Sequence, residues 1–252
     1  EISKFLNDPN GDSSLVPTYI IQKKIKDYTN VSLGGDGGDE SFFGYITFDA
    51  FYLARIFKKI TPLFVLNILK KTAKLFKVSS DYITFKTKII KFFSSIDLEE
   101  KHLLPSWMAC LDKNNLKILF KDEKTDDVFY EEMNSIFSIK NNSMRIAQLY
   151  HFKFYLPMIL SKIDQASMFN SVESRSPLLS KRIINFSLEN DISKFYSLSN
   201  KKKFLKKKFK NLISNDILYR KKHGFAFPKE SLLKDKEFID KFIDYNLLIN
   251  KN

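Results

Sequence analysis

The chain has 252 residues, of which 44% are hydrophobic and 15% aromatic, so it can bury a sizeable core and is not a generally disordered protein. Its formal net charge of +13 has two interpretations, a polyanionic partner such as nucleic acid or a drift of composition towards lysine. We favour drift, because Lys, Asn, Ile and Phe are abundant where Arg, Ala and Gly would be ordinary.

The first part of the chain is predicted to contain a helix and a strand. A turn-rich loop at 8–14 precedes a helix that Pro17 opens and that runs to about Asp27. The short run 31–33 ends in glycines and is typical of a buried strand. The chain begins with Glu1 and shows no secretory signal, and we expect the beginning of the gene product to be missing.

A glycine-rich acidic loop follows the strand. Four of the seven glycines of the protein fall within it, namely Gly34, Gly35, Gly37 and Gly38. Glycine lets a ligand approach the backbone, and a strand, a glycine loop and a helix start together make an anion site. The loop also carries the carboxylates of Asp36, Asp39 and Glu40. Because carboxylates repel phosphate unless a cation lies between them, these residue types predict a loop that faces magnesium-bound nucleotide.

Other kinds of loop fit this pattern less well. No Gly-Lys-Ser/Thr follows the glycines, as a P-loop requires. A dinucleotide-binding turn would not carry several acids, and the spacing is not that of a helix-loop-helix calcium site. A tight, solvated turn without a ligand remains the alternative.

The middle of the chain is predicted to be mainly helical. Apolar residues recur at helical spacing from 42 to about 59. Breaks are expected near Pro62, at 79–80 and near Pro105. The most apolar stretch, 60–69, is too short for a membrane span, so we predict no membrane partner. A lone cysteine, Cys110, cannot form an intrachain disulfide, which favours a cytoplasmic setting.

The last third of the chain carries two charged segments. Its predicted elements are a helix at 157–171, a turn at Pro177 and a basic helix at 201–212. On their own, Asp164, Glu173 and Arg175 are typical of a structural network of paired charges. The basic helix on its own is typical of a solvated face.

Three blocks of the sequence, in one order, resemble the asparagine synthetase family. The stretch 31–45, VSLGGDGGDESFFGY, resembles the glycine-acid motif of the family. Residues 156–179 resemble its second signature, Leu-Pro followed by Asp-x-x-Ser-Met and Glu-x-Arg-x-Pro. Residues 200–206 and 220–228 resemble its lysine helix and its Gly-Phe-x-x-Pro turn. The resemblance runs from residue 8 to residue 228.

The chain also departs from the family pattern. It has Gly34 for Ser, Phe43 for Gly, Gln165 for Arg, Leu178 for Phe, Ser180 for Asp and Lys206 for Arg. Neither the family's Ser-Gly-Gly-x-Asp-Ser pyrophosphate loop nor its glutaminase domain occurs in this sequence. We therefore expect a C-terminal fragment that is inactive by itself.

The resemblance implies an α/β fold with a partial parallel-sheet nucleotide-binding layer of the adenine nucleotide alpha hydrolase type and a large, mainly helical C-terminal region. Within one synthetase-type domain over 1–252, it assigns 1–60 to the layer and 61–252 to the helical part. It implies that ATP and Mg²⁺ serve to convert aspartate to asparagine through an aspartyl-adenylate. Ammonia would come from glutamine at an N-terminal glutaminase domain, and a homodimer is compatible with the family.

The resemblance also implies roles for single residues. ATP would be bound by Gly34, Gly35, Gly37 and Gly38. Asp39 would hold magnesium, Asp36 would act at the acyl centre, and Lys202 would stabilise the phosphates. Support for the site would come from Glu40, Asp164, Glu173, Arg175 and Lys222.

Three other functions stay open. A related synthetase, such as a β-lactam-forming enzyme or an amidotransferase, would share the core chemistry and differ in the acceptor. A non-catalytic basic module would bind nucleic acid in a salt-sensitive way but would leave the acidic glycine loop unexplained. A degenerate, inactive relative is the third.

Overall fold

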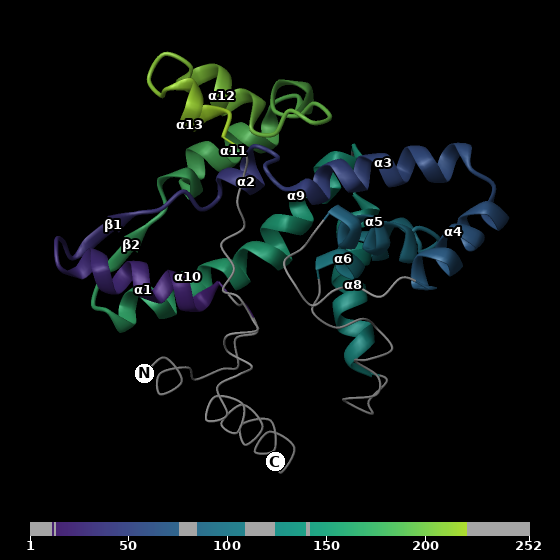
Figure 1. The fold of residues 1–252 in the computed structure, drawn as a ribbon, viewed down its shortest axis with the longest axis horizontal. Helices are drawn as coiled ribbons and strands as arrows, with labels where there is room; N and C mark the ends of the chain where they lie inside the picture. The colour runs from purple at the N-terminus through teal and green to yellow at the C-terminus, as the bar shows by residue number, and fades with distance from the viewer. Residues whose placement is uncertain (1–11, 13, 76–84, 109–123, 140–141, 221–252) are drawn as a thin grey trace, which may run out of the picture.

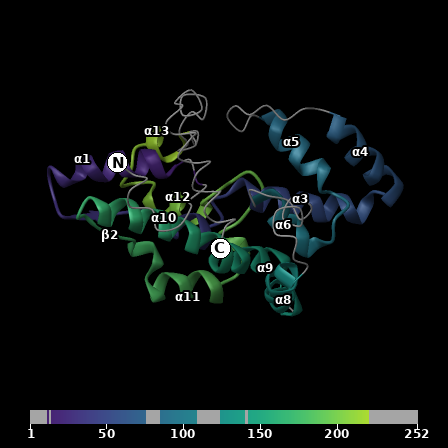
Figure 2. The same ribbon diagram turned by 90° about the horizontal axis from the view of Figure 1, so that it is seen from below.

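The structure, a computed structural model, describes residues 12, 14–75, 85–108, 124–139 and 142–220 (Figure 1). In chain order its elements are α1 (Leu15–Lys26), β1 (Val31–Leu33), α2 (Gly38–Ser41), α3 (Ile46–Ile60), α4 (Leu63–Leu75), α5 (Phe85–Ser94), α6 (Glu100–Met108), α8 (Lys124–Ser138) and α9 (Ser143–Tyr150). They continue with the π-helix η2 (His151–Tyr155), α10 (Leu156–Phe169), β2 (Glu173–Arg175), the 3₁₀ helix η3 (Pro177–Leu179), α11 (Lys181–Glu189), the 3₁₀ helix η4 (Ile192–Lys194), α12 (Lys203–Phe209) and α13 (Asn215–Leu218). The sheet, α1 and α10 lie at one end of the molecule, and α3 to α6 lie at the other (Figures 1 and 2).

The two strands form a parallel pair in which Ser32 lies opposite Ser174. Helix α10 packs against α1 and β2, and the rings of Tyr19 and Phe169 meet there with centroids 5.1 Å apart. A mainly helical α/β fold with a small parallel sheet is thereby confirmed. The finer prediction of a nucleotide-binding layer stays a prediction.

Strand β1 is not buried as predicted. The side chain of Leu33 is 77% exposed, and that of Val31 is also exposed. Side chains alternate across a strand, so these two share one face while Ser32 points to the other. The described helices do not cover the face of Val31 and Leu33, although the apolar run suggested burial on both faces.

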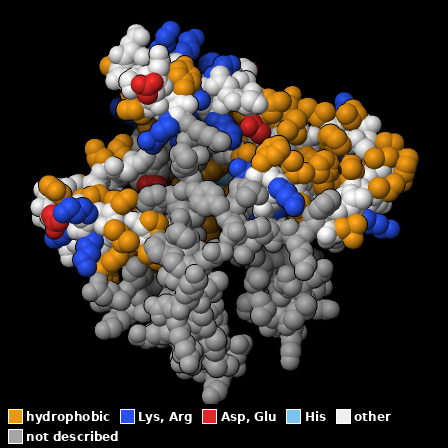
Figure 3. All heavy atoms as spheres, viewed as in Figure 1, with side chains coloured by type: hydrophobic (Ala, Val, Ile, Leu, Met, Phe, Trp, Pro, Cys, Tyr) orange, Lys and Arg blue, Asp and Glu red, His pale blue; other side chains and the backbone are white. Residues whose placement is uncertain are grey.

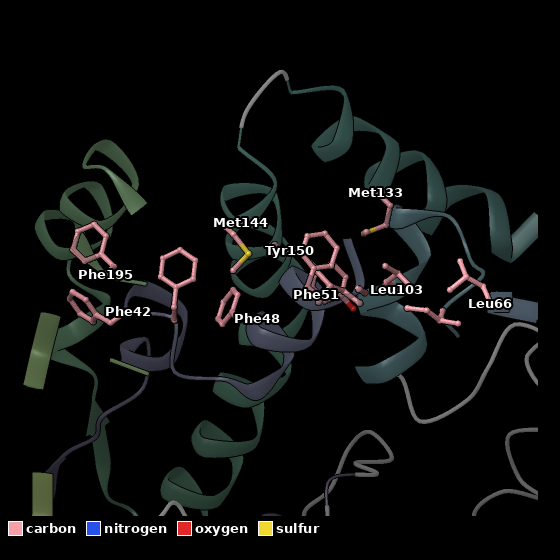
Figure 4. Packing of buried hydrophobic residues seen from close by; sticks show 14 residues of the cluster. Phe42, Phe48, Phe51, Leu66, Leu103, Met133, Met144, Tyr150 and Phe195 are labelled. Carbon is pink, nitrogen blue, oxygen red and sulfur yellow. The ribbon is translucent and has the colours of Figure 1, made fainter. Parts of the chain in front are cut away.

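The main hydrophobic core begins directly after the glycine-rich loop (Figure 4). Phe42 packs against Phe195 and Phe204, with ring centroids 5.9 Å and 5.7 Å away. Phe48 and Phe51 continue the core towards α6, α8 and α9. Each fully buried ring contributes about 1.5–3 kcal/mol, so the core fixes the C-terminal end of the loop.

Several predicted elements agree with the structure within a few residues. The N-terminal helix is α1, the helix after residue 156 is α10, and the turn at Pro177 is η3. The break near Pro62 is also found, because α3 ends at Ile60 and α4 begins at Leu63.

Other elements were predicted wrongly. Pro105 lies inside α6 and does not break it, and its side chain is buried in the core region. The loop was expected to run through Glu40, but α2 begins within it at Gly38, and α3 begins only at Ile46. The basic helix is shorter than expected, since α12 ends at Phe209.

Some predictions lie outside the described residues. These are most of the turn-rich loop at 8–14, the break at 79–80, the family turn within 221–228 and the positions of Cys110 and Lys222. The division of the domain after residue 60 stays a prediction. Within the described ranges, none of the helices combines the length and the apolar character that crossing a bilayer requires.

Candidate active site

The glycine-rich loop begins where both strands end. The backbone N–H of Gly34 donates to the carbonyl oxygen of Arg175 at 2.7 Å. Two residues further on, the hydroxyl of Ser176 donates to the Asp36 carboxylate at 3.3 Å. In open α/β sheets, ligands bind outside the carboxyl ends of the parallel strands. The loop therefore lies at the edge of the sheet where a ligand is expected.

The four loop glycines occupy two different environments. Gly37 has φ +84°, in the left-handed region, and a Cβ there would lie 2.2 Å from Leu179 Cδ2. A Cβ on Gly38 would lie 2.9 Å from Leu178, so glycine at these two positions serves the contact with η3. Gly35 is exposed, with no other atom within 4 Å of its Cβ position. The open side of the loop is therefore at Gly35.

The departure at Gly34 is consistent with its surroundings. A Cβ at this position would lie 2.6 Å from the Asp36 carboxylate oxygen Oδ2. The serine that the family usually has here would require the Asp36 side chain to move. Glycine thus lets Asp36 fold back towards the strand end, where Ser176 reaches it.

An ion pair joins the loop to the start of α12. Lys202 Nζ lies 3.0 Å from Asp39 Oδ1, and both side chains are partly exposed. Lys202 has φ +54°, a left-handed conformation that few non-glycine residues adopt and that recurs at functional sites. The structure thus brings together two residues that the sequence predicted for the site.

Gly44 makes room for this ion pair. A Cβ on Gly44 would lie 1.7 Å from Asp39 Oδ1 and 2.6 Å from Lys202 Cε. Its neighbour Phe43 has φ +53°, a backbone conformation that suits the glycine that the family usually has at this position. The strain of such a backbone, about 1–3 kcal/mol, is offset because the Phe43 ring is fully buried. We missed the role of Gly44 from sequence, although the motif contains it.

Glu40 points into the protein and takes no part in the Asp39–Lys202 ion pair. Its side chain is buried, and Tyr45 Oη donates to its carboxylate at 2.7 Å. Burial raises the pKa of Glu40, and the Tyr45 hydrogen bond acts in the opposite direction. Burial, with the Glu40 carboxylate beside it, raises the pKa of the Tyr45 phenol. The buried hydrogen bond between Tyr45 and the Glu40 carboxylate therefore anchors the C-terminal end of the loop to the core.

Buried polar residues of α9 form hydrogen bonds to the backbone at the C-terminal end of the loop. Gln148 Nε2 donates to the carbonyl oxygens of Glu40 and Ser41, at 3.1 Å and 3.2 Å. The Arg145 guanidinium donates to Gln148 Oε1 and to the carbonyl oxygen of Ser187. Sequence reasoning missed both side chains, because their pattern on α9 resembles that of any amphipathic helix.

His151 lies fully buried under the start of α3. Its Nδ1 bonds to the carbonyl oxygen of Ala147 at 2.7 Å, so this nitrogen carries the proton. Nε2 then accepts from the Thr47 hydroxyl at 2.9 Å. The ring stacks on Tyr45 and Phe48. Burial lowers the pKa of His151 to about 4, so the ring is neutral at neutral pH.

This burial predicts a pH-dependent stability. Because the pKa of His151 falls from 6.5 to about 4 on folding, the unfolded chain binds more protons between these values. The free energy of unfolding should therefore decrease by up to about 3 kcal/mol as the pH falls from 6.5 to 4. Urea unfolding of the wild type and of His151→Gln at several pH values measures this decrease in the free energy of unfolding.

Comparing the pH dependence of the free energy of unfolding in the two proteins isolates the contribution of His151 from that of other titrating groups. One such group is Glu40, whose raised pKa stabilises the folded protein as the pH falls, opposite to the effect of His151. His151→Gln should show a weaker decrease between pH 6.5 and 4 than the wild type. Parallel curves for wild type and His151→Gln would contradict the buried neutral imidazole.

Among the described residues, no side-chain hydrogen bond or ion pair links Asp164, Glu173 or Arg175 to the Asp39–Lys202 pair. Glu173 and Arg175 form an exposed ion pair with each other on β2. Asp164 is exposed on α10, and no hydrogen bond or ion pair between described residues joins its carboxylate to the loop. Lys206, on α12, has its Nζ 5.5 Å from the centroid of the Tyr219 ring. The support predicted for Asp164, Glu173 and Arg175 stays a prediction.

The loop carboxylates fit magnesium only if substrate oxygens complete the coordination. The described residues hold no group of three or more metal-binding side chains. Asp36 and Asp39 offer hard oxygen ligands and are partly exposed, although Asp39 Oδ1 is buried beside Lys202, whereas the carboxylate of Glu40 is buried against Tyr45. Magnesium is commonly held by one or two carboxylates together with substrate phosphates. The donor set therefore suits a metal that arrives with a nucleotide.

The sequence also matches proteins of known family. The asparagine synthase family matches residues 1–245. The chain is 24% identical to asparagine synthetase (glutamine-hydrolysing) 1 of Bacillus subtilis, over 91% of this chain and 36% of that protein. It is 21% identical to a provisionally assigned glutamine-hydrolysing asparagine synthetase of Mycobacterium bovis, over 95% of this chain and 36% of that protein.

The chain thus spans 36% of the length of these curated relatives. No solved structure matches it. The family match extends over nearly the whole sequence and includes the glycine-rich loop, both strands and α12. The chain therefore belongs to the asparagine synthase family.

Proposed function

We propose that this chain is the synthetase part of an ATP-dependent amide-forming ligase that converts aspartate to asparagine. The observation that carries the proposal is the Lys202–Asp39 ion pair, which lies beside a glycine-rich loop at the carboxyl edge of a parallel sheet. The family match supports the same chemistry. A partial nucleotide-binding layer built around β1 and β2 is part of the proposal.

The proposed reaction has two steps. An oxygen of the aspartate side-chain carboxylate attacks the α-phosphorus of ATP, and the bond to pyrophosphate breaks. The nitrogen of ammonia then attacks the carbonyl carbon of the aspartyl-adenylate, and AMP leaves. Ammonia would come from glutamine at a glutaminase domain in the full-length protein. Such a domain, a homodimer and a cytoplasmic location all stay proposals.

Four residues of the loop, together with Lys202, would take part in this reaction. Gly34 and Gly35 would contact the nucleotide, and the open backbone at Gly35 supports this assignment. Lys202 would hold its ammonium against the phosphates and offset the charge of the leaving pyrophosphate. Asp36 would lie near the acyl centre and accept a proton from the incoming ammonium. Asp39 would hold magnesium, which when bound neutralises phosphate charge.

Pyrophosphate release with different carboxylates tests the proposal. The full-length protein with ATP and Mg²⁺ should release pyrophosphate when aspartate is added, and AMP when glutamine or ammonia is also present. Glutamate and β-amino-acid carboxylates serve as matched acceptors. The chain of 252 residues alone, tested in parallel, should release none, which examines the prediction that it is inactive by itself.

Three outcomes would overturn the assignment in different ways. Release with another carboxylate but not with aspartate would favour a related synthetase. Salt-sensitive binding to duplex DNA without any pyrophosphate release would favour the basic-module alternative. Neither activity, in a folded protein that does not bind ATP, would indicate a degenerate relative.

A further inference from the structure

The outer faces of α3, α4 and α5 expose an unusual amount of apolar surface. We call this the α3–α5 surface; it comprises Leu53, Ile56, Ile60, Leu63, Phe64, Ile68, Leu75, Phe85 and Ile89, all exposed. Figure 3 shows apolar side chains gathered over α3 and α4 at one end of the molecule. Large contiguous apolar patches are rare on monomeric proteins and mark interaction sites.

The spacing of these residues is regular on each helix. On α3, Ile56 and Ile60 lie on the side opposite the buried Phe51. On α4, Phe64 and Ile68 lie opposite the buried Leu66, and the Phe64 side chain is 66% exposed. Each helix therefore has two apolar faces, one in the core and one towards solvent, although packing against the core requires only one.

The same surface is positively charged. Segments 50–75 and 85–96 contain nine Lys and Arg residues and no Asp or Glu. At least three of these nine are engaged within the protein: Arg55 and Lys70 pair with acids just beyond these segments, at 2.9 Å and 2.6 Å, and half-buried Lys58 donates to the carbonyl oxygen of Leu98. Lys71 is exposed and lies at helical spacing between Ile68 and Leu75, so its charge falls within the apolar row.

We propose that the α3–α5 surface docks onto an anionic membrane surface. Helices with apolar residues on one face and flanking lysines lie in the headgroup region, and each cation near an anionic leaflet adds to the attraction. Lysine stems can lie along apolar groups while their ammonium groups reach the headgroups. The binding is peripheral, so it needs no spanning helix.

Charge complementarity favours this occupant over two others. A second copy packed face to face would bring these cations against their own counterparts, and like charges across an interface are unfavourable. Nucleic acid would neutralise the lysines but would leave the aliphatic side chains of Ile60 and Ile68 without partners, because such interfaces are polar. The prediction of no membrane partner rested on the lack of a segment long enough to span a bilayer. Peripheral docking needs no such segment, because three separate helices together form this surface.

Vesicle co-sedimentation of the full-length protein tests the proposal. The protein should bind vesicles of phosphatidylcholine containing phosphatidylglycerol and bind pure phosphatidylcholine weakly. Ile60→Glu/Phe64→Glu should reduce binding to the anionic vesicles by about tenfold or more. Lys59→Gln/Lys71→Gln should reduce the preference for anionic vesicles, as should added salt. All four side chains are exposed, so folding should persist.

Tyr28→Glu/Leu212→Glu is the matched control, because these side chains are 79% and 78% exposed outside the α3–α5 surface. This variant should bind as the wild type does. Equal binding to both vesicle types, or an equal loss in the control, would overturn the proposal. A fall in oligomeric mass of Ile60→Glu/Phe64→Glu without any vesicle binding would assign the surface to a second copy. Pyrophosphate release is measured without vesicles, so the two proposals fail separately.

Discussion

Replacing Lys202 with alanine in the full-length protein is expected to lower aspartate-dependent pyrophosphate release by about 10²–10³-fold. Its ammonium lies 3.0 Å from Asp39, which belongs to the glycine-rich loop segment. Without this charge, nothing at this position would offset the charge that builds up on the leaving pyrophosphate. Single-turnover measurement of pyrophosphate release checks the prediction, with glutaminase activity expected to be unchanged.

Two further variants separate charge from stability. Lys207→Ala removes an exposed lysine from the same helix and should leave pyrophosphate release unchanged. Lys202→Gly should be as inactive as Lys202→Ala but more stable by about 1 kcal/mol, because residue 202 has φ +54° and glycine tolerates this conformation. Normal release in Lys202→Ala would remove this lysine from the reaction.

Gly44→Ala is expected to produce a comparable loss of pyrophosphate release, about 10²-fold. The added Cβ would lie 1.7 Å from Asp39 Oδ1 and 2.6 Å from Lys202 Cε, so both groups must move. The backbone of Gly44 is not in the left-handed region. The overall stability should therefore change less than the activity, which thermal unfolding and single-turnover assays compare directly.

A double-mutant cycle tests whether Gly44 acts through the ion pair. In the Lys202→Ala background, Gly44→Ala should cost much less activity than it does in the wild type, because the pair is already broken. Full additivity of the two losses would contradict this coupling. It would mean that Gly44 affects the reaction by another route, such as through the buried Phe43 beside it.

Local pattern predicted a large part of the fold. Helix α10 and the turn η3 follow from apolar periodicity and from the positions of Pro157 and Pro177. The glycine-rich loop was identified as the candidate site because its composition is unusual over a short stretch. These features depend on neighbouring residues, whose preferences the sequence displays directly.

Tertiary contacts overrode local preference elsewhere. Pro105 is accommodated inside α6, where its side chain is buried, although proline usually ends a helix. Leu33 is exposed although its strand looked buried, because burial depends on which elements cover each face of the sheet. Amino-acid pattern specifies which faces are apolar but not which neighbours are available to cover them.

The sequence by itself determined the family, the glycine-rich loop and the residue types of the candidate site. Only the tertiary structure decided that Glu40 is buried, that Gln148 holds the loop from behind and that Gly44 leaves space for the Asp39–Lys202 pair. These facts depend on contacts between residues far apart in the chain. Such contacts arise from close packing in three dimensions, which no local periodicity records.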